Sequence, residues 1–389
     1  MFTKRGGVTK EQVIEALRGV MDPELHMSIV DLDMVKDISV RGSRVAITVA
    51  LTVAGCPMQT EIRERVTAAL APVPEVDDVT VDLTVMTEAE LNRVRDKMRA
   101  RHGSGGAASS AATGQRLGHE EGRTNPFQDP TSRTRILGIS SGKGGVGKSS
   151  VSVNLAVALA RQGHEVGILD ADVYGFSVPK MLGIDHDPVV IDDMIVPPVA
   201  FDVKCISIGF FVDDDQPVMW RGPMLHKALE QFLVDVYWGE LDFLLVDMPP
   251  GTGDVALSMA QYLPRSEVYV VTTPQPAAQR VAQRTAYMAK KINLPLRGVI
   301  ENMSWFTADD GTRYELFGRG GGAMLAADLG VPLLGQIPLV PALREGGDVG
   351  RPITVAEPGG EATEAFGSVA AEIVSRGASR VFRPELTIR

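Results

Sequence analysis

Residues 142–149 read Gly-Lys-Gly-Gly-Val-Gly-Lys-Ser, and this stretch decides the fold of the chain. It fits the pattern G-x-x-x-x-G-K-[ST], in which a glycine-rich backbone curls and turns its N–H groups toward an anion. An apolar strand, 135–140, precedes the stretch, and a helix with one apolar face, 151–160, follows it. Because a helix N-terminus adds a favourable partial charge, the order of strand, loop and helix predicts a phosphate-binding site.

The residue types of this loop indicate a bound nucleotide. Lys148 would reach the β- and γ-phosphates, and the hydroxyl of Ser149 would bind Mg²⁺. A glycine-rich turn without phosphate is the alternative, but the strand and the helix stand in register on both sides and favour the nucleotide. We therefore expect the nucleotide to contact Gly142, Lys143, Gly144, Gly145, Val146, Gly147, Lys148, Ser149 and Ser150.

The length and composition of the chain limit the classes of protein to which it can belong. The chain has 389 residues, of which 44% are hydrophobic, and these values predict two domains with sizeable cores. The formal net charge of −10 argues weakly against non-specific binding to nucleic acid. The polar start of the chain resembles no signal peptide, and no apolar run approaches the ~18 residues of a membrane span. Two cysteines cannot form a disulfide framework. We expect a cytoplasmic protein that binds neither nucleic acid nor membrane.

A linker separates the two expected domains. Residues 103–114 read Gly-Ser-Gly-Gly-Ala-Ala-Ser-Ser-Ala-Ala-Thr-Gly, which is the composition of a flexible linker. We therefore expect a small domain at 1–100, a linker at 101–134 and a large domain at 135–389.

The small domain shows the patterns of a mixed fold. A capping-box pattern opens a helix at Thr9, and the alternating apolar residues of 45–51 and 79–85 indicate strands. Pro57 can open a second helix that runs to about Ala71. This order of helix, strands, helix and strand predicts a compact α+β domain.

The large domain alternates strands and helices, which predicts an α/β fold with a mostly parallel sheet flanked by helices. Runs such as 243–246 are apolar on both faces, as in strands that are covered on both sides. In such sheets the ligand lies at the carboxyl ends of the strands. The strand candidates are 135–140, 165–170, 204–207, 243–247, 267–272, 297–301 and 333–337.

Carboxylates follow two of these strands. Asp247 ends the strand 243–247, where a carboxylate faces the phosphate loop and can hold the hydration shell of Mg²⁺. Asp170-Ala171-Asp172 stands at the end of the apolar run 166–169. For Asp170 a strand-end cap that binds neighbouring backbone N–H groups is as well supported as contact with the metal.

The two lysines of the loop 142–149 resemble the deviant phosphate loop of the dimeric ATPases related to MinD, ParA and the nitrogenase iron protein. This resemblance implies a P-loop NTPase that binds ATP with Mg²⁺ and forms a homodimer, in which Lys143 touches the phosphates bound by the other subunit. It also implies catalytic roles for Lys143, Lys148 and Asp172, the last of which would orient the attacking water. Asp170 would join Ser149 and Asp247 near the metal, and Asn302 would bind the adenine.

Four further stretches narrow the resemblance to the Mrp-type iron–sulfur carrier ATPases, the subfamily of ApbC. They are 170–180, 247–254, 301–304 and 317–322. The small domain resembles the α+β domain of cluster-assembly proteins related to PaaD, with matching runs at 22–25 and 55–58. The resemblance implies an ATPase, slow and coupled to cluster or partner binding, that passes iron–sulfur clusters to apo-proteins and works with cluster-assembly factors.

One departure from these carriers concerns the cluster ligands. Most of them have a C-x-x-C pair shortly after the E-N-M-S motif, and two pairs in a dimer supply four thiolates to one [4Fe–4S] cluster. The corresponding segment here, 305–311, contains no cysteine. The alternative is a regulatory or positioning ATPase, related to MinD and ParA, that binds no cluster.

Two cysteines are left to supply a thiolate. Cys56 precedes a predicted helix start, where the pKa of a thiol falls, so it is the candidate cluster ligand. A small buried residue is the alternative for Cys56. Cys205 lies within the strand 204–207, where a role in the core is favoured.

Overall fold

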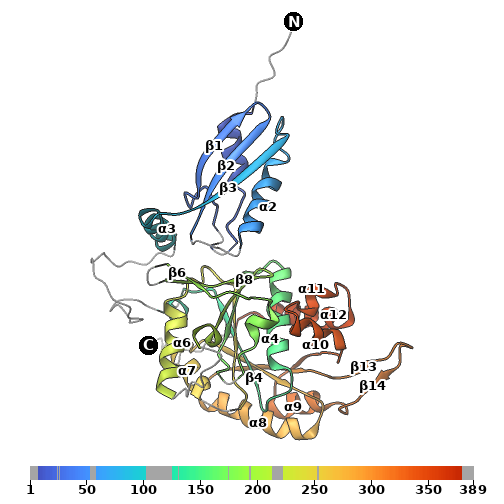
Figure 1. The fold of residues 1–389 in the computed structure, drawn as a ribbon. Helices are drawn as coiled ribbons and strands as arrows, with labels where there is room; N and C mark the ends of the chain where they lie inside the picture. Colours follow the sequence, from blue (N-terminus) through green and yellow to red (C-terminus); the bar gives the residue numbers. More distant parts are fainter. Residues whose placement is uncertain are drawn as a thin grey trace, which may run out of the picture. The chain divides into compact units, whose positions relative to one another are not determined.

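The computed structural model of the chain has two compact units (Figure 1). One comprises residues 1–117 and 189–196, and the other comprises 118–188 and 197–389. Most of the predicted linker lies outside the described residues, so the domain boundaries given above stay a prediction. The structure describes residues 8–23, 25, 27–52, 58–101, 125–129, 131–173, 175–191, 194–212, 222–251 and 254–378.

The small unit has the α+β fold that the sequence predicts. Its central strand, β2, is antiparallel to β1 and parallel to β3. The predicted capping box is present, because the Thr9 side chain accepts from the backbone of Gln12 and the Gln12 side chain accepts from the backbone of Thr9. β1 and α3 were not anticipated, because charged and polar residues dominate both segments. The elements are α1 (Lys10–Leu17), β1 (Val35–Arg41), β2 (Arg44–Leu51), α2 (Gln59–Leu70), β3 (Asp78–Val85) and α3 (Glu88–Arg101).

An eight-stranded sheet forms the centre of the large unit. The seven strands predicted from the sequence are all present and run parallel to one another. The eighth, β8, pairs antiparallel with β9 at one edge of the sheet. The order across the sheet is β15 (Leu333–Gln336), β12 (Leu296–Glu301), β11 (Glu267–Thr272), β4 (Arg135–Ser141), β10 (Phe243–Asp247), β5 (Val166–Asp170), β9 (Val203–Ser207) and β8 (Val199–Ala200).

The helices of the large unit are α4 (Lys148–Arg161), α5 (Val178–Met181), α6 (Gly222–Val234), α7 (Asp254–Tyr262), α8 (Pro276–Lys291), α9 (Gly321–Leu329), α10 (Pro341–Asp348), α11 (Ile353–Ala356) and α12 (Glu361–Ser375). Short elements accompany them: the 3₁₀ turns η1 (Pro126–Gln128) and η2 (Ile208–Phe211), and the strand pair β13 (Phe306–Thr307) with β14 (Arg313–Tyr314). The strand pair β6 (Val189–Ile191) with β7 (Met194–Val196) belongs to the unit that includes residues 1–117.

Helices cover both faces of the sheet, which explains why its strands are apolar on both sides. α4 and α12 pack together on one face, where Leu137 and Ile139 of β4 contribute to a core that includes Phe366 of α12. Gly138, the residue between them, faces the Met259 side chain of α7 on the other face. The alternation along β4 therefore shows that α4 and α7 lie on opposite sides (Figure 1).

The register of the sheet brings the carboxyl ends of the central strands together. Asp247 of β10 is the cross-strand partner of Asp170 on β5 and of Ile139 on β4. Asp170 is in turn the partner of Ser207 on β9. Because the strands are parallel, these residues meet at the edge from which the phosphate loop leaves β4.

Truncation of Phe366 should destabilise the large unit strongly. This side chain is fully buried between α12 and the sheet, so Phe366→Ala should lower the free energy of unfolding by about 3–5 kcal/mol. Ser368→Ala on the exposed face of the same helix should change it by less than about 0.5 kcal/mol. Urea unfolding followed by circular dichroism compares the two variants, and equal midpoints would contradict this packing.

Candidate phosphate-binding site

The phosphate loop connects β4, which ends at Ser141, to α4, which begins at Lys148. Gly147 caps the helix with a φ of 78°, a conformation that side chains other than glycine rarely adopt. A Cβ at this position would also collide with the side-chain amide of Asn302. The cavity of about 250 Å³ beside the loop is lined by Ser141, Lys143, Gly144, Gly145, Gly147, Lys148, Ser149, Ser150, Asp172, Gly175, Ser177, Met181 and Pro250.

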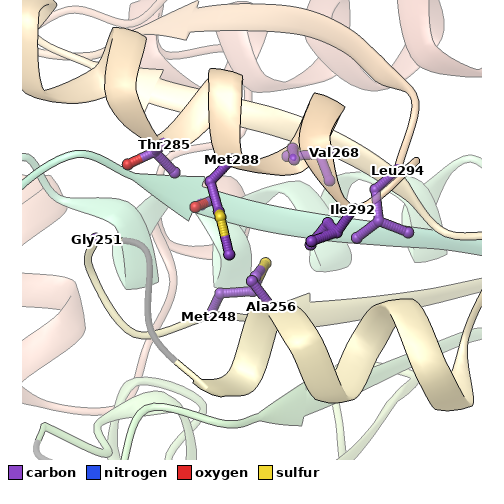
Figure 2. Close-up of a pocket in the computed structure, with 10 residues that line it drawn as sticks. Met248, Gly251, Ala256, Val268, Thr285, Met288, Ile292 and Leu294 are labelled. Carbon is purple, nitrogen blue, oxygen red and sulfur yellow. The ribbon is translucent and has the colours of Figure 1, made fainter.

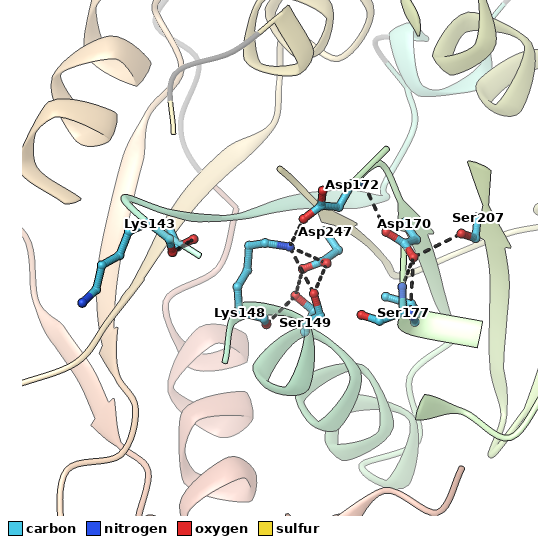
Figure 3. A network of polar contacts seen from close by, with 11 residues as sticks. Lys143, Lys148, Ser149, Asp170, Asp172, Ser177, Ser207 and Asp247 are labelled. Carbon is cyan, nitrogen blue, oxygen red and sulfur yellow. Dashed lines mark hydrogen bonds and ion pairs between the residues drawn. The ribbon is translucent and has the colours of Figure 1, made fainter. Parts of the chain in front are cut away.

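Lys148 is the central cation of this site. Its side chain is buried, and its Nζ lies 2.5 Å from Oδ2 of Asp247 and 3.6 Å from Oδ2 of Asp172. It also donates to the Ser149 hydroxyl at 3.2 Å. Figure 3 shows this network, in which one ammonium group joins the phosphate loop to the ends of β5 and β10. Two carboxylates therefore balance the buried positive charge.

Asp247 organises the start of α4. Its Oδ2 accepts from Ser149 Oγ at 2.6 Å, and its Oδ1 accepts from Ser152 Oγ at 2.5 Å. The adjacent oxygens of Ser149 and Asp247 are hard donors of the type that Mg²⁺ prefers. Ser152 was missed in the sequence, although its position three residues after Ser149 places both on one helix face.

Asp170 caps the segment that follows β5. Its carboxylate accepts from the backbone N–H groups of Asp172, Ser177 and Val178 at 3.1–3.2 Å and from the hydroxyl of Ser207 at 3.1 Å. This is the strand-end cap left open above, and the role beside magnesium stays a prediction. Burial, reinforced by the charge of Asp247, raises the pKa of Asp170 to about 7.

Lys143 and Asn302 make contacts outside the Lys148 network. Lys143 extends away from the Lys148 network (Figure 3), and its Nζ is 3.4 Å from Oε1 of Gln275. Asn302 is buried, and its amide donates to the carbonyl of Val146 at 2.9 Å. Its Oδ1 and the hydroxyl of Thr273 have no hydrogen-bond partner among the described residues. The contacts of Lys143 with a second subunit and of Asn302 with adenine stay predictions.

The segment that carries cysteines in the resembled carriers has a different chemistry here. Glu361 at the start of α12 accepts from Trp305 Nε1 and Thr307 Oγ1, both at 2.9 Å, and pairs with Arg313 at 2.6 Å. The guanidinium of Arg313 also lies over the Trp305 ring. A polar and aromatic cluster therefore fixes β13 and β14, and sequence patterns did not indicate the partner from α12.

The two cysteines differ in what the structure describes. Cys205 is fully buried on β9, which confirms its expected place in the core, and burial, reinforced by the charge of Asp170, raises the pKa of its thiol well above the ordinary value. Cys56 lies outside the described residues. Among the residues that are described, no group of three or more histidine, cysteine, aspartate or glutamate side chains is placed to hold a metal ion.

A second cavity lies between the sheet, α7 and α8 (Figure 2). Its volume is about 10 Å³, which suits about one water molecule and no nucleotide. Met248 and Gly251, from the segment after β10, face Met288 and Thr285 of α8 across it. Of these two cavities in the described part of the chain, the one beside the phosphate loop is therefore the one with room for a nucleotide.

A family of sequences matches the large unit. The sequence model described as "NUBPL iron-transfer P-loop NTPase" matches residues 132–374, more than half of the chain. The chain belongs to this family. A second model, described as "Iron-sulfur cluster assembly protein", matches residues 10–83 of the small unit. Both resemblances found in the sequence, to the carrier ATPases and to a cluster-assembly domain, are thus confirmed.

Relatives match this NUBPL-family chain over most of its length. An iron-sulfur cluster carrier protein of Mycobacterium leprae is 47% identical over 353 residues, which cover 89% of this chain and 88% of the relative. A protein of the same description from Synechocystis is 39% identical and covers 95% of this chain and 98% of the relative. A solved nucleotide-binding protein of Archaeoglobus fulgidus, in complex with ADP, is 34% identical with a TM-score of 0.53; the match covers 62% of this chain and 95% of that protein.

The chain is a P-loop nucleotide-binding NTPase, as its membership of this family and the geometry of the loop indicate. In the part of the chain that is described, no helix combines the length and the apolar character needed to cross a membrane.

Removal of the central cation should abolish nucleotide binding. Lys148→Ala deletes the ammonium that would meet the phosphates, and we expect ATP affinity to fall about 100-fold or more, because hydrogen bonds to charged groups are the strong ones. Titration with a fluorescent ATP analogue measures the affinity. Lys227→Ala, an exposed lysine on α6, is the matched control. Unchanged affinity of the Lys148 variant would rule out this phosphate site.

Proposed function

We propose that this chain hydrolyses ATP and uses the cycle to carry iron–sulfur clusters to apo-proteins. The observation that carries the proposal is the joint placement of Lys148, Ser149 and Asp247 at the phosphate loop. The names of the relatives, which are iron-sulfur cluster carrier proteins, support the cargo. The match of the small unit to cluster-assembly proteins supports it independently.

The proposed hydrolysis needs alignment and charge neutralisation rather than covalent chemistry. Backbone N–H groups of the loop and the ammonium of Lys148 bind the β- and γ-phosphates. Ser149 and Asp247 would hold Mg²⁺, which would supply positive charge beside the transferring phosphoryl group. Asp172 lines the same cavity, 3.6 Å from Lys148, where its carboxylate can orient a water molecule. Asn302 Oδ1, which lacks a partner in the described residues, supports a contact with the base.

We further infer a cytoplasmic homodimer that turns over slowly. Lys143 supports this inference, because its side chain extends away from the Lys148 network (Figure 3), and its ammonium makes a long contact, 3.4 Å, with the uncharged side chain of Gln275. Turnover coupled to a cluster or a partner would reset such a dimer. Apo-proteins and cluster-assembly factors are the expected partners.

The small number of cysteines in the chain limits how it could bind an iron–sulfur cluster. A [4Fe–4S] cluster takes four cysteine ligands, and the chain has two cysteines, one of which is buried in the core. Only Cys56 is left to bind a cluster, so a homodimer would supply two thiolates. The remaining ligands would then come from a donor, a client or a small thiol.

A second candidate function is a regulatory or positioning ATPase that binds no cluster. The cluster of Trp305, Thr307 and Arg313 around Glu361 favours it, because these groups occupy the segment where the resembled carriers hold thiolates. This candidate shares the ATPase site with the first and differs from it only in the cargo.

Loss of the Asp172 carboxylate should separate ATP binding from hydrolysis. Asp172→Ala should bind ATP with an affinity close to that of the wild type, because Lys148 and the loop remain. Its kcat should fall about 100-fold, since the attacking water loses its orienting group. Phosphate release under saturating ATP measures kcat, with the exposed Asp185→Ala as control. A variant that turns over at the wild-type rate would remove Asp172 from the mechanism.

Iron counting should separate the two candidate functions. After anaerobic reconstitution with iron and sulfide, the wild type should retain both and transfer them to an apo-protein, whereas Cys56→Ala should lose them. Cys205→Ala is the matched control and should retain them, because this thiol is buried. Equal iron in the Cys56 variant and the wild type would exclude Cys56 as a ligand. A wild type that retains no iron and transfers none would favour the regulatory ATPase.

A further inference from the structure

The carboxylate of Asp170 accepts hydrogen bonds from four donors of the protein itself. Its Oδ2 accepts from the backbone N–H groups of Ser177 and Val178 and from the hydroxyl of Ser207, and its Oδ1 accepts from the N–H of Asp172. Each carboxylate oxygen has two lone pairs, so Oδ2 has at least as many donors as it can accept, whereas Oδ1 keeps one lone pair. Asp170 is also completely buried. A metal ion at Oδ2 would therefore have to displace groups that already bind this oxygen.

Three of the four donors of Asp170 belong to the segment that carries the proposed water-orienting residue. Asp172 lies at the start of this segment, and Ser177 and Val178 lie where α5 begins. One carboxylate thus ties both ends of the segment to the tip of β5 (Figure 3). The position of the Asp172 side chain, 3.6 Å from Lys148, follows from this anchoring.

β9 also helps to hold this segment in place. Ser207 is the cross-strand partner of Asp170, and its hydroxyl donates to Asp170 while it accepts from the N–H of Gly209 at 3.1 Å. Gly209 lies against the ring of Phe176, and a Cβ at this glycine would come within 2.5 Å of the ring. Ser207 and Gly209 therefore support the segment that follows β5, through their contacts with Asp170 and Phe176.

We propose that Asp170 and Ser207 are positioning residues that set the place of Asp172 for hydrolysis, and that Asp170 is not a magnesium ligand. The proposal rests on the ATP hydrolysis proposed above. It assigns a role to Ser207, which lies 37 residues from Asp170 in the sequence and does not line the cavity beside the loop. A metal-binding role for Asp170 predicts instead that Asp170→Asn raises the Mg²⁺ concentration for half-maximal rate.

Steady-state kinetics on the full chain test the proposal, with Ser207→Ala, Gly209→Ala and Asp170→Asn compared with the wild type. Each variant should lower kcat about tenfold or more, because the water-orienting carboxylate is displaced. The KM for ATP and the Mg²⁺ concentration for half-maximal rate should stay within about twofold of the wild type, since Lys148, Ser149 and Asp247 are untouched.

Ser266→Ala is the matched control for lost stability. Ser266 is also completely buried and donates to the carbonyl of Leu263 at 2.7 Å, in a turn before β11. It should lower the melting temperature about as much as Ser207→Ala and leave kcat unchanged. Rates are compared well below the melting temperature of every variant, so that unfolding does not contribute to them.

Two results would overturn the proposal: a Ser207→Ala protein with the wild-type kcat, or an Asp170→Asn protein whose half-maximal Mg²⁺ concentration rises tenfold or more. If Asp170→Asn does not fold, Ser207→Ala and Gly209→Ala decide the matter. Binding of a fluorescent ATP analogue and turnover by the wild type are measured first. Their absence would refute the proposed function, and the positioning roles with it, whereas normal wild-type turnover with unaffected variants refutes the positioning roles alone.

Discussion

The buried ion pair between Lys148 and Asp247 is the interaction on which the rest of the site depends. It joins the loop after β4 to the end of β10 at 2.5 Å, with both side chains buried. Buried ion pairs often contribute little to stability, because removing two charges from water costs several kcal/mol. This pair is therefore better explained by function, because Asp247 holds the ammonium of Lys148 in place. The hydroxyls of Ser149 and Ser152 bind the same carboxylate, and these contacts fix the position of the first turn of α4.

The parallel sheet makes this arrangement possible. Four chain segments far apart in sequence end at one edge because β4, β10, β5 and β9 run in the same direction with matched register. Two carboxylates at that edge have taken different roles for a physical reason. Asp247 faces cationic and hydroxyl donors, whereas Asp170 faces backbone N–H groups and Ser207. Burial, reinforced by the charge of Asp247, raises the pKa of Asp170 to about 7, although the N–H groups of Val178 and Asp172 act in the opposite direction.

Local patterns predicted the parts of this structure that depend on neighbouring residues. The seven parallel strands were found because their apolar runs are continuous, and the loop was found because Gly147, Lys148 and Ser149 follow a fixed spacing. Contacts between distant segments could not be predicted in this way. Nothing in the sequence near Ser207 indicates a partner at Asp170, and nothing near Trp305 indicates Glu361. The hydrogen bond from the Asn302 amide to the carbonyl of Val146 also joins distant segments, and the sequence did not indicate it.

In the large unit, the nucleotide site and the segment where the resembled carriers hold thiolates obey separate constraints. At the phosphate loop every group serves the geometry of a triphosphate, so few substitutions would be tolerated. The segment from Trp305 to Arg313 needs only a stable fold, and hydrogen bonds to Glu361 provide one without cysteines. A chain can therefore keep a complete site for ATP while the thiolates for a cluster come from elsewhere. Under the proposed function, hydrolysis would act through the position of backbone segments, so the energy of ATP would serve cluster transfer whichever molecule supplies the sulfur ligands.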